Sequence, residues 1–207
     1  MIDQIEENPT HIGHVLRAST NGFDFGTRGN VIDERHSFGS FVLAEIAGAG
    51  EACYAIGLIY AIRIADDPFV RELVMATEVK ESTLKDQRHN RLVPIETLVL
   101  NVGYVYEGGA IVHSMPPRPP LSLTQVHLMP PDWVVAFVAK QDFFRMVLNA
   151  GEVPSDDLLA AAVRHAAQFQ PDEQAQADYM VRCGRKVASL LTGDLKRIAH
   201  ILNLMKA

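Results

Sequence analysis

The segment from residue 52 to residue 65, ACYAIGLIYAIRIA, constrains the fold most strongly, because it is apolar on both faces of an expected strand. The bulky face comprises Tyr54, Ile56, Leu58, Tyr60, Ile62 and Ile64, and the mostly small face comprises Cys53, Ala55, Gly57, Ile59 and Ala61. The curved interior of a small closed barrel admits small side chains. The pattern therefore predicts a barrel strand whose bulky outer face is covered by other elements.

Three hairpins are predicted in a row between residues 10 and 127. In the first, HVLRAST and FDFG flank Asn21-Gly22, the strongest short-range signal for a two-residue turn with φ > 0 at both positions. The second joins SFVLAEI to the strand described above through residues 47–51, and the third turns TLVLNVGYVY into AIVHS at residues 107–109. Consecutive hairpins predict an antiparallel sheet.

Beyond Pro130-Pro131 the apolar residues adopt helical spacing. The first helical segments carry Trp133, Phe137, Phe143, Phe144, Val147 and Leu148. Ser155, followed by two aspartates, is predicted to be the N-cap of another helix. A last amphipathic helix carries Leu195, Ile198, Ile201, Leu202 and Met205. We expect this stripe to pack inside the protein, and the alternative is a docking helix for a partner.

These patterns predict an α+β fold, in which a small antiparallel β-barrel is followed by an α-helical C-terminal region. We assign residues 1–130 to the barrel, with a charged excursion at 66–94, and residues 131–207 to the helices. The excursion opens with Asp67-Pro68, which predicts the start of a helix. Pro154 is an equally good boundary between the two parts.

Composition narrows the class of protein. Of the 207 residues, 48% are hydrophobic and 21% charged, which is typical of a globular chain. No run approaches the roughly 18 apolar residues that a membrane-spanning helix needs, and the first ten residues are acidic, unlike a signal peptide. We therefore expect a cytoplasmic protein with no membrane partner. The net charge of -6 argues against a general nucleic-acid-binding surface.

One tetrapeptide suggests an enzyme. His11-Ile12-Gly13-His14 spells HIGH, the signature with which class I aminoacyl-tRNA synthetases and related nucleotidyltransferases hold ATP phosphates at a helix start. On the strand predicted here, His11 and His14 are expected on opposite faces, unable to converge on one ligand. The lysine-rich loop that should follow is matched poorly by residues 80–83. The nucleotidyltransferase is therefore the least favoured alternative.

Other chemical motifs are missing from the sequence. The remaining histidines lack metal-ligand spacing, and Cys53 and Cys183 have no ligand residues near them in the chain. Neither a GxSxG nor a GxxxxGK[ST] pattern occurs. We therefore expect no catalytic residue, no cofactor and no metal, that is, a protein without enzymatic activity. The prolines at 116–120 predict a strap across a barrel end, with strand residues resuming at Leu121; the alternative is a polyproline ligand.

Two charged regions are candidate contact surfaces. The excursion carries basic residues among nearly as many acidic ones, and its predicted partner interface comprises Arg71, Lys85, Arg88 and Arg91. Near the C-terminus, bases outnumber acids, and the predicted contact residues for nucleic acid or an acidic partner are Arg182, Arg185, Lys186, Lys196 and Arg197. Balanced charge of the first kind is usually a solvated face.

Five segments carry a resemblance to a known family: IGHVLRASTNGFDF, FGSFVLAE, AIGLIYAIRIADDP, VLNVGYVYEGG and MPPRPPLSLTQVHLMPPD. They resemble the HAS-barrel, the small N-terminal β-barrel shared by HerA-type DNA-translocating ATPases and the ATP synthase family. The resemblance covers residues 11–131 and rests on short motifs: an IGxV strand, a Phe-x-Phe hairpin, a strand ending in Glu, and a proline-rich strap. The P-loop ATPase core that follows in HerA-like proteins is missing from this chain.

The resemblance implies a docking role, because such barrels sit on one end of a hexameric motor ring and contact other subunits or a nuclease. We therefore expect a non-enzymatic accessory protein of DNA processing that associates with a HerA-like P-loop ATPase or its nuclease, or assembles into a homo-oligomer. The alternative of a different class is a nucleic-acid-binding barrel that uses its basic C-terminal helices.

Overall fold

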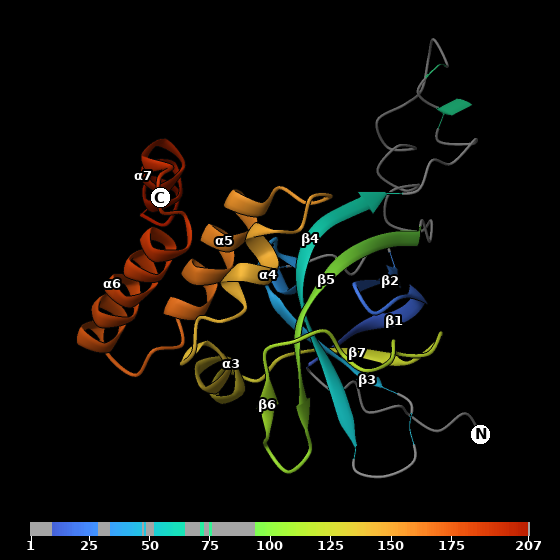
Figure 1. Cartoon of the computed structure of the whole chain (residues 1–207). Helices are drawn as coiled ribbons and strands as arrows, with labels where there is room; N and C mark the ends of the chain where they lie inside the picture. Colours follow the sequence, from blue (N-terminus) through green and yellow to red (C-terminus); the bar gives the residue numbers. More distant parts are fainter. Residues whose placement is uncertain are drawn as a thin grey trace.

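The computed structural model describes residues 10–28, 34–46, 48, 52–64, 71–72, 75 and 94–206. It shows strands on one side of the molecule and helices on the other (Figure 1). Every strand is contained in the first part of the described chain, and the five named helices all follow the last strand.

The strands form one antiparallel sheet. They are β1 (His11–Ala18), β2 (Gly22–Arg28), β3 (Phe41–Ile46), β4 (Cys53–Ile64), β5 (Pro94–Tyr106), β6 (Ile111–Val112) and β7 (Gln125–Leu128). Their order is β2-β1-β7-β3-β4-β5-β6, and β2 also pairs with β5. This additional pairing closes the first six into a barrel, while β6 only extends the far half of β5. The predicted antiparallel barrel and its three hairpins are confirmed.

The helices are α3 (Pro131–Val138), α4 (Phe144–Leu148), α5 (Ser155–Ala167), α6 (Glu173–Leu190) and α7 (Leu195–Leu204). The α+β class and the helical C-terminal region are therefore confirmed. That residues 131–207 form a domain of their own stays a prediction. No helix in the described part of the chain combines the length and the apolar character that crossing a membrane requires.

The two faces of β4 belong to two separate cores, as the sequence predicts. Cys53, Ala55 and Ile59 are buried inside the barrel, whereas Ile56 and Leu58 point outward into a core shared with the helices. The small interior residues are required by the curvature. A Cβ atom on Gly57 would lie 2.1 Å from Cγ1 of Val99 on the neighbouring strand.

The first hairpin forms with a different turn from the predicted one. Three residues, 19–21, separate β1 from β2, and neither Asn21 nor Gly22 has a positive φ. The backbone N–H of Ser19 donates to the carbonyl oxygen of Gly22 at 2.8 Å, and that of Asn21 donates to Oγ of Ser19 at 3.2 Å. Gly22 is needed for space, because a Cβ there would lie 2.1 Å from the carbonyl oxygen of Val99. The prediction of a two-residue turn with positive φ at Asn21 and Gly22 was therefore wrong.

The helix containing Ser155 begins one residue earlier than predicted. Pro154 occupies the N-cap position, and Ser155 is the first helical residue, with no side-chain cap. The hydroxyl of Ser155 instead accepts a hydrogen bond of 3.2 Å from Nη2 of Arg197, which comes from α7. The predicted acidic first turn has a tertiary role as well, since Asp156 binds the same arginine.

The last helix packs mainly inside the protein. Ile201 and Met205 of its apolar stripe are buried in the core shared with α5 and α6. Leu195, at the first position of α7, remains 78% exposed. Packing is thus the main role of this stripe.

Candidate functional site

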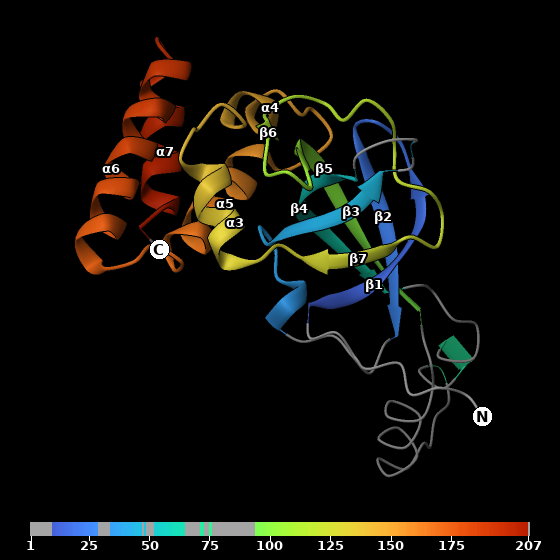
Figure 2. The ribbon, with the colours of Figure 1, turned by 90° about the horizontal axis from the view of Figure 1, so that it is seen from below.

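The helices cover only one side of the barrel, as Figures 1 and 2 show. The buried core beneath them contains outward-facing residues of β3, β4 and β5, such as Phe41, Ile56 and Val102, and none of β1 or β7. We call the outer surface of β3, β4 and β5 the covered wall. The open wall is the surface formed by His11, His14, Leu16, Leu121, Leu123 and His127.

The open wall includes three exposed leucines. Leu16 of β1 is 46% exposed, and Leu121 and Leu123 are 61% and 76% exposed. The last two belong to residues 121–124, which we call the leucine strap. The backbone N–H of Leu123 donates to the carbonyl oxygen of Val15 at 2.7 Å, and that of Val15 donates to Thr124 at 2.9 Å. The strap is therefore fixed against β1, beside Leu16.

The backbone of Leu123 is strained. Its φ is 68°, the only positive φ at a non-glycine residue in the described part of the chain. A left-handed conformation costs an ordinary L-residue about 1–2 kcal/mol. Burial of the side chain does not offset this strain, because Leu123 is among the most exposed large apolar residues of the protein. Strain of this kind, held by surrounding hydrogen bonds, is a recurrent mark of functional surfaces.

The leucine strap also corrects an expectation from the sequence. Strand residues do not resume at Leu121; β7 begins at Gln125. Pro120 forms an isolated bridge with Ile46, which fixes the proline-rich segment to the barrel just before the leucine strap. The alternation of Leu121, Ser122 and Leu123 is typical of a strand, but the left-handed backbone at Leu123 interrupts it.

Three histidines gather on the same wall, against expectation. The ring centroids of His11 and His14 lie 4.8 Å apart, so the prediction that these side chains point to opposite faces was wrong. A β-bulge is the reason. His11 pairs with His127, whereas Gly13 pairs with Val126 and His14 with Gln125, so β1 uses one extra residue between His11 and Gly13. The extra residue resets the alternation of side chains.

The residues between the two histidines make this arrangement possible. Ile12 is buried inside the barrel, and Gly13 is also buried. A Cβ on Gly13 would lie 2.6 Å from the carbonyl oxygen of Gly26 and 2.6 Å from Cδ2 of Phe25. Only glycine fits where β1 approaches β2 so closely. The tetrapeptide lies in a strand, as the hairpin interpretation predicts, and not at a helix start.

His127 completes the cluster from β7. Its ring lies 5.7 Å from that of His11, and its Nδ1 lies 3.3 Å from Oγ1 of Thr10. Burial lowers the pKa of His127, and the neighbouring His11 and His14 lower it further. Among the described residues, no three histidine, cysteine or acidic side chains are arranged to hold a metal ion.

Three other described histidines, His36, His113 and His165, serve structure. His113 shares a hydrogen bond of 3.0 Å with the carbonyl oxygen of Phe137, and His36 shares one of 3.2 Å with Ile12. His165 packs against Phe41 on the covered wall, and burial lowers its pKa. The two cysteines are buried. Burial raises the pKa of Cys183 to about 11, which keeps its thiol protonated and unreactive at neutral pH.

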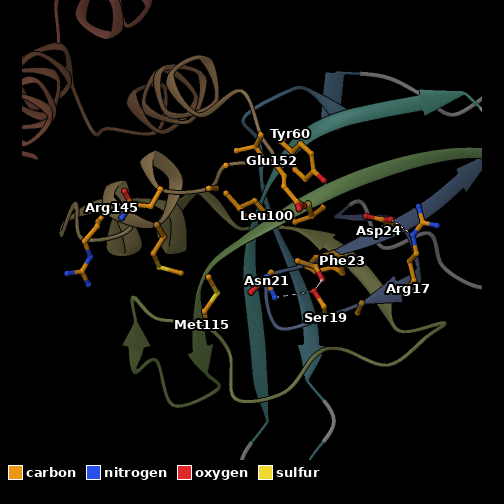
Figure 3. A pocket seen from close by; sticks show the side chains of 18 residues that line it. Arg17, Ser19, Asn21, Phe23, Asp24, Tyr60, Leu100, Met115, Arg145 and Glu152 are labelled. Carbon is orange, nitrogen blue, oxygen red and sulfur yellow. Dashed lines mark hydrogen bonds and ion pairs between the residues drawn. The ribbon is translucent and has the colours of Figure 1, made fainter. Parts of the chain in front are cut away.

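A cleft of about 690 Å³ lies between the first hairpin, strands β4 and β5, and the α4–α5 connection. Figure 3 shows Tyr60 and Glu152 on one side of it, Arg17 and Asp24 at its barrel end, and Met115 facing α4. The lining thus mixes apolar side chains with charges of both signs.

At the barrel end of this cleft, the positive charge of Arg17 is paired with two carboxylates. Arg17 forms an ion pair with Asp24 and a second one, of 3.4 Å, with Glu96. The hydrogen bond with Asp24 is the main reason why the pKa of Arg17 is raised. Burial, followed by the charge of Asp24, raises the pKa of Tyr60. A cation already held by two carboxylates is poorly suited to bind an anionic ligand.

The basic residues of the C-terminal helices do not act as one surface. Nζ of Lys186 lies 3.0 Å from the carboxylate of Asp142, and Arg197 donates to Asp156 at 2.7 Å. These two ion pairs join helices and loops that are distant in sequence. Arg182, Arg185 and Lys196 are exposed. Two of the five predicted contact residues, Lys186 and Arg197, therefore form ion pairs that stabilise the fold.

The predicted interface in the charged excursion is described only in part. Arg71 and Glu72 are helical and exposed. Lys85, Arg88 and Arg91 lie outside the described residues, as do most of the predicted helix after Asp67-Pro68 and the loop at 80–83.

Sequence reasoning missed the open wall as a candidate site. The leucines of the strap could have been noted as an apolar pair following prolines, but their exposure depends on the left-handed turn. Comparison with protein-family models and with curated protein sequences gives no match for this chain.

Proposed function

We propose that this protein is a non-enzymatic accessory protein whose barrel docks on a protein partner through the open wall. The partner class that we propose is a HerA-like DNA-translocating P-loop ATPase or its associated nuclease. The protein would then act in DNA processing in the cytoplasm, as one copy or several on a motor ring.

The leucine strap carries this proposal. An exposed leucine gains about 1.5–3 kcal/mol when it is transferred from water into an apolar interface. For Leu123 that gain is comparable to the cost of about 1–2 kcal/mol for its left-handed backbone. A residue that is strained and exposed in the free protein, but buried in a complex, resembles the preformed anchors of protein interfaces. Leu16 and Leu121 are further exposed apolar side chains of the open wall.

The partner class comes from the resemblance to the HAS-barrel. The five segments that carry the resemblance include residues of β1 to β5, of the proline-rich segment and of β7, and these strands belong to one closed barrel. In the family that they resemble, such barrels make contacts between subunits at one end of a motor ring. The helices of this chain leave β1 and β7 uncovered, which supports docking by that side.

The proposal is tested by equilibrium binding between the purified protein and a purified HerA-like ATPase from the same organism. We expect the double variant Leu16→Asp, Leu123→Asp to lose at least tenfold in affinity. Leu195→Asp is the matched control, because Leu195 is as exposed as Leu123 but lies on α7. Light scattering of the protein alone measures self-assembly through the same wall. Equal binding by all three proteins would overturn the docking surface, and absence of binding would overturn the partner class.

Nucleic-acid binding is the second candidate, favoured by the exposure of Arg182, Arg185 and Lys196. Ion pairing of Lys186 and Arg197 weakens it. Contacts to phosphates release counterions, so this candidate predicts an affinity for single- or double-stranded DNA that falls steeply with salt. The strand position of His11 to His14 removes the helix start that a nucleotidyltransferase signature requires, and we do not propose that activity.

A further inference from the structure

The turn of the first hairpin exposes an asparagine that is followed directly by a glycine. Asn21 lies at the rim of the cleft shown in Figure 3, and its side chain is exposed to solvent. Asn21-Gly22 is the only such pair in the sequence. Asparagine is a chemically labile residue. When a glycine follows, the backbone nitrogen of that glycine can reach the side-chain carbonyl carbon, Cγ, because glycine has no Cβ to obstruct the approach.

We propose that Asn21 is a site of spontaneous modification, at which the folded protein deamidates through a cyclic imide. A bond forms between the backbone nitrogen of Gly22 and Cγ of Asn21, and Nδ2 of Asn21 leaves as ammonia with the proton of the Gly22 N–H. Water then opens the five-membered ring at either of its two carbonyl carbons. The products are an ordinary aspartate and an isoaspartate, in which the main chain is longer by one methylene group. The reaction consumes one water and needs no other reactant.

The hydrogen bonds of the turn leave the attacking nitrogen available. The backbone N–H and the hydroxyl of Ser19 donate to the carbonyl oxygen of Gly22, at 2.8 and 3.3 Å. In the ladder between β2 and β5, the N–H of Asn101 donates to the carbonyl oxygen of Asn21 at 2.9 Å. Bonded and non-bonded pairs alternate in an antiparallel ladder, so the next pair, Gly22 with Leu100, is a non-bonded one. Outside the strand ladders, the described bonds of Gly22 therefore involve its oxygen and not its nitrogen.

Asn149, across the same cleft, is the matched comparison. It is exposed like Asn21, but the residue that follows it is Ala150, whose methyl group crowds the approach. The N–H of Ala150 also donates to the carbonyl oxygen of Val147 at 3.1 Å, so this nitrogen is already engaged. Of the other described asparagines, Asn101 is fully buried and Asn203 lies within α7. Among the described asparagines, the structure thus favours reaction at Asn21.

An isoaspartate at position 21 should weaken the hairpin. Asn101 ties the turn to β5, because its N–H donates to the carbonyl oxygen of Asn21 and its Nδ2 donates to that of Thr20 at 3.0 Å. An extra methylene group in the main chain changes the spacing of these two carbonyl groups. The fully buried amide of Asn101 would then lose an acceptor that water cannot replace. An ordinary aspartate keeps the backbone and adds only a charge on the surface, so its effect should be small.

The experiment follows the masses of peptides from the purified protein during incubation at pH 7.5 and pH 8.5. Digestion takes place in mildly acidic solution, beside an unincubated sample. The peptide with Asn21 should gain about 1 Da and separate into two products. Conversion should be about tenfold faster at pH 8.5, because the attacking nitrogen must lose its proton. The peptide with Asn149 is the internal control, and Asn21→Gln, which needs a larger ring, is the control variant; neither should change.

Each outcome decides the proposal, which is independent of the docking function. Conversion of Asn21 that increases with time and pH, while Asn149 stays intact, supports it. No conversion, equal conversion of Asn149, or conversion only after unfolding in urea would overturn it. In the same samples, the isoaspartate fraction should unfold at a lower urea concentration than the unmodified protein, whereas Asn21→Asp should match the wild type. An isoaspartate fraction as stable as the unmodified protein would overturn the role of Asn101 in holding the turn.

Discussion

The covered wall and the open wall of the barrel are built from similar alternating strands, but their outward residues differ in kind. On the covered wall, Phe41, Ile56 and Leu58 are buried beneath the helices. On the open wall, the outward residues are leucines and histidines that remain in contact with solvent. The helical region thus completes the fold on one side of the barrel and leaves an exposed surface on the other.

The covered wall should dominate the stability of the whole protein. Phe137 of α3 is fully buried and packs against Phe41 of β3, with ring centroids 5.9 Å apart, and against Phe143 at 5.1 Å. We expect Phe137→Ala to lower the free energy of unfolding by about 3–5 kcal/mol, measured by urea denaturation. On the open wall, Leu121→Ala should cost less than about 0.5 kcal/mol. Equal losses would show that the two walls do not differ as described.

A substitution at Gly13, in the bulge of β1, should change the arrangement of the open wall. Gly13→Ala would force its Cβ against Gly26 and Phe25, and we expect a loss of about 1–3 kcal/mol in urea denaturation. The rings of His11 and His14 should also separate, which histidine NMR signals would show. For comparison, Gly151→Ala meets nothing within 4 Å and should leave stability unchanged or slightly higher. A neutral Gly13→Ala variant would contradict the close approach of β1 and β2.

Acid should weaken the fold through histidines of both walls. The pKa values of His113, His127 and His165 are lowered, with burial as the first cause. The folded state thus binds fewer protons than the unfolded chain, so the stability they support is complete above about pH 6.5 and is lost as the pH falls below it. Each contributes a slope of at most about 1.4 kcal/mol per pH unit.

Denaturation of His165→Phe at pH 7.5 and 5.5 measures the part of this loss that belongs to the covered wall. We expect the variant to lose less stability between the two pH values than the wild-type protein. An identical or larger pH dependence would contradict burial of a neutral His165.

The smallest effect is expected at Leu123. Glycine relieves a left-handed strain of about 1–2 kcal/mol, but it also makes the unfolded chain more flexible by about 0.5–1 kcal/mol. Leu123→Gly should therefore be as stable as the wild type or more stable by about 0.5 kcal/mol. The same variant should bind the partner more weakly. A clear loss of stability would mean that Leu123 supports the fold and not a surface.

Much of the barrel could be predicted because its rules are local. The small and bulky faces of β4 follow directly from side-chain alternation, and each hairpin joins segments that are adjacent in sequence. The small barrel was predicted from the sizes of the residues on the two faces of β4, and Gly57, which lies against Val99, shows why small residues are needed inside it.

The open wall depends on features that leave little trace in a sequence. The β-bulge that brings His11 and His14 together interrupts the alternation of side chains between the two faces of β1. Gly13 is the only residue of this segment whose type indicates the bulge. The left-handed turn at Leu123 occurs at a residue type that rarely adopts it. The ties of Lys186 and Arg197 join partners 44 and 41 residues away, which charge counting along the chain does not reveal.

Site-specific photo-crosslinking would show which face of the protein contacts the partner. A photoreactive phenylalanine analogue replaces Leu121 on the open wall or, in a separate protein, Leu195 on α7; both leucines are exposed. Each protein is irradiated with the purified HerA-like ATPase at pH 7.5. We predict a covalent complex from position 121 and none from position 195. Crosslinking from position 195 alone would place the interface on the helices and contradict docking through the open wall.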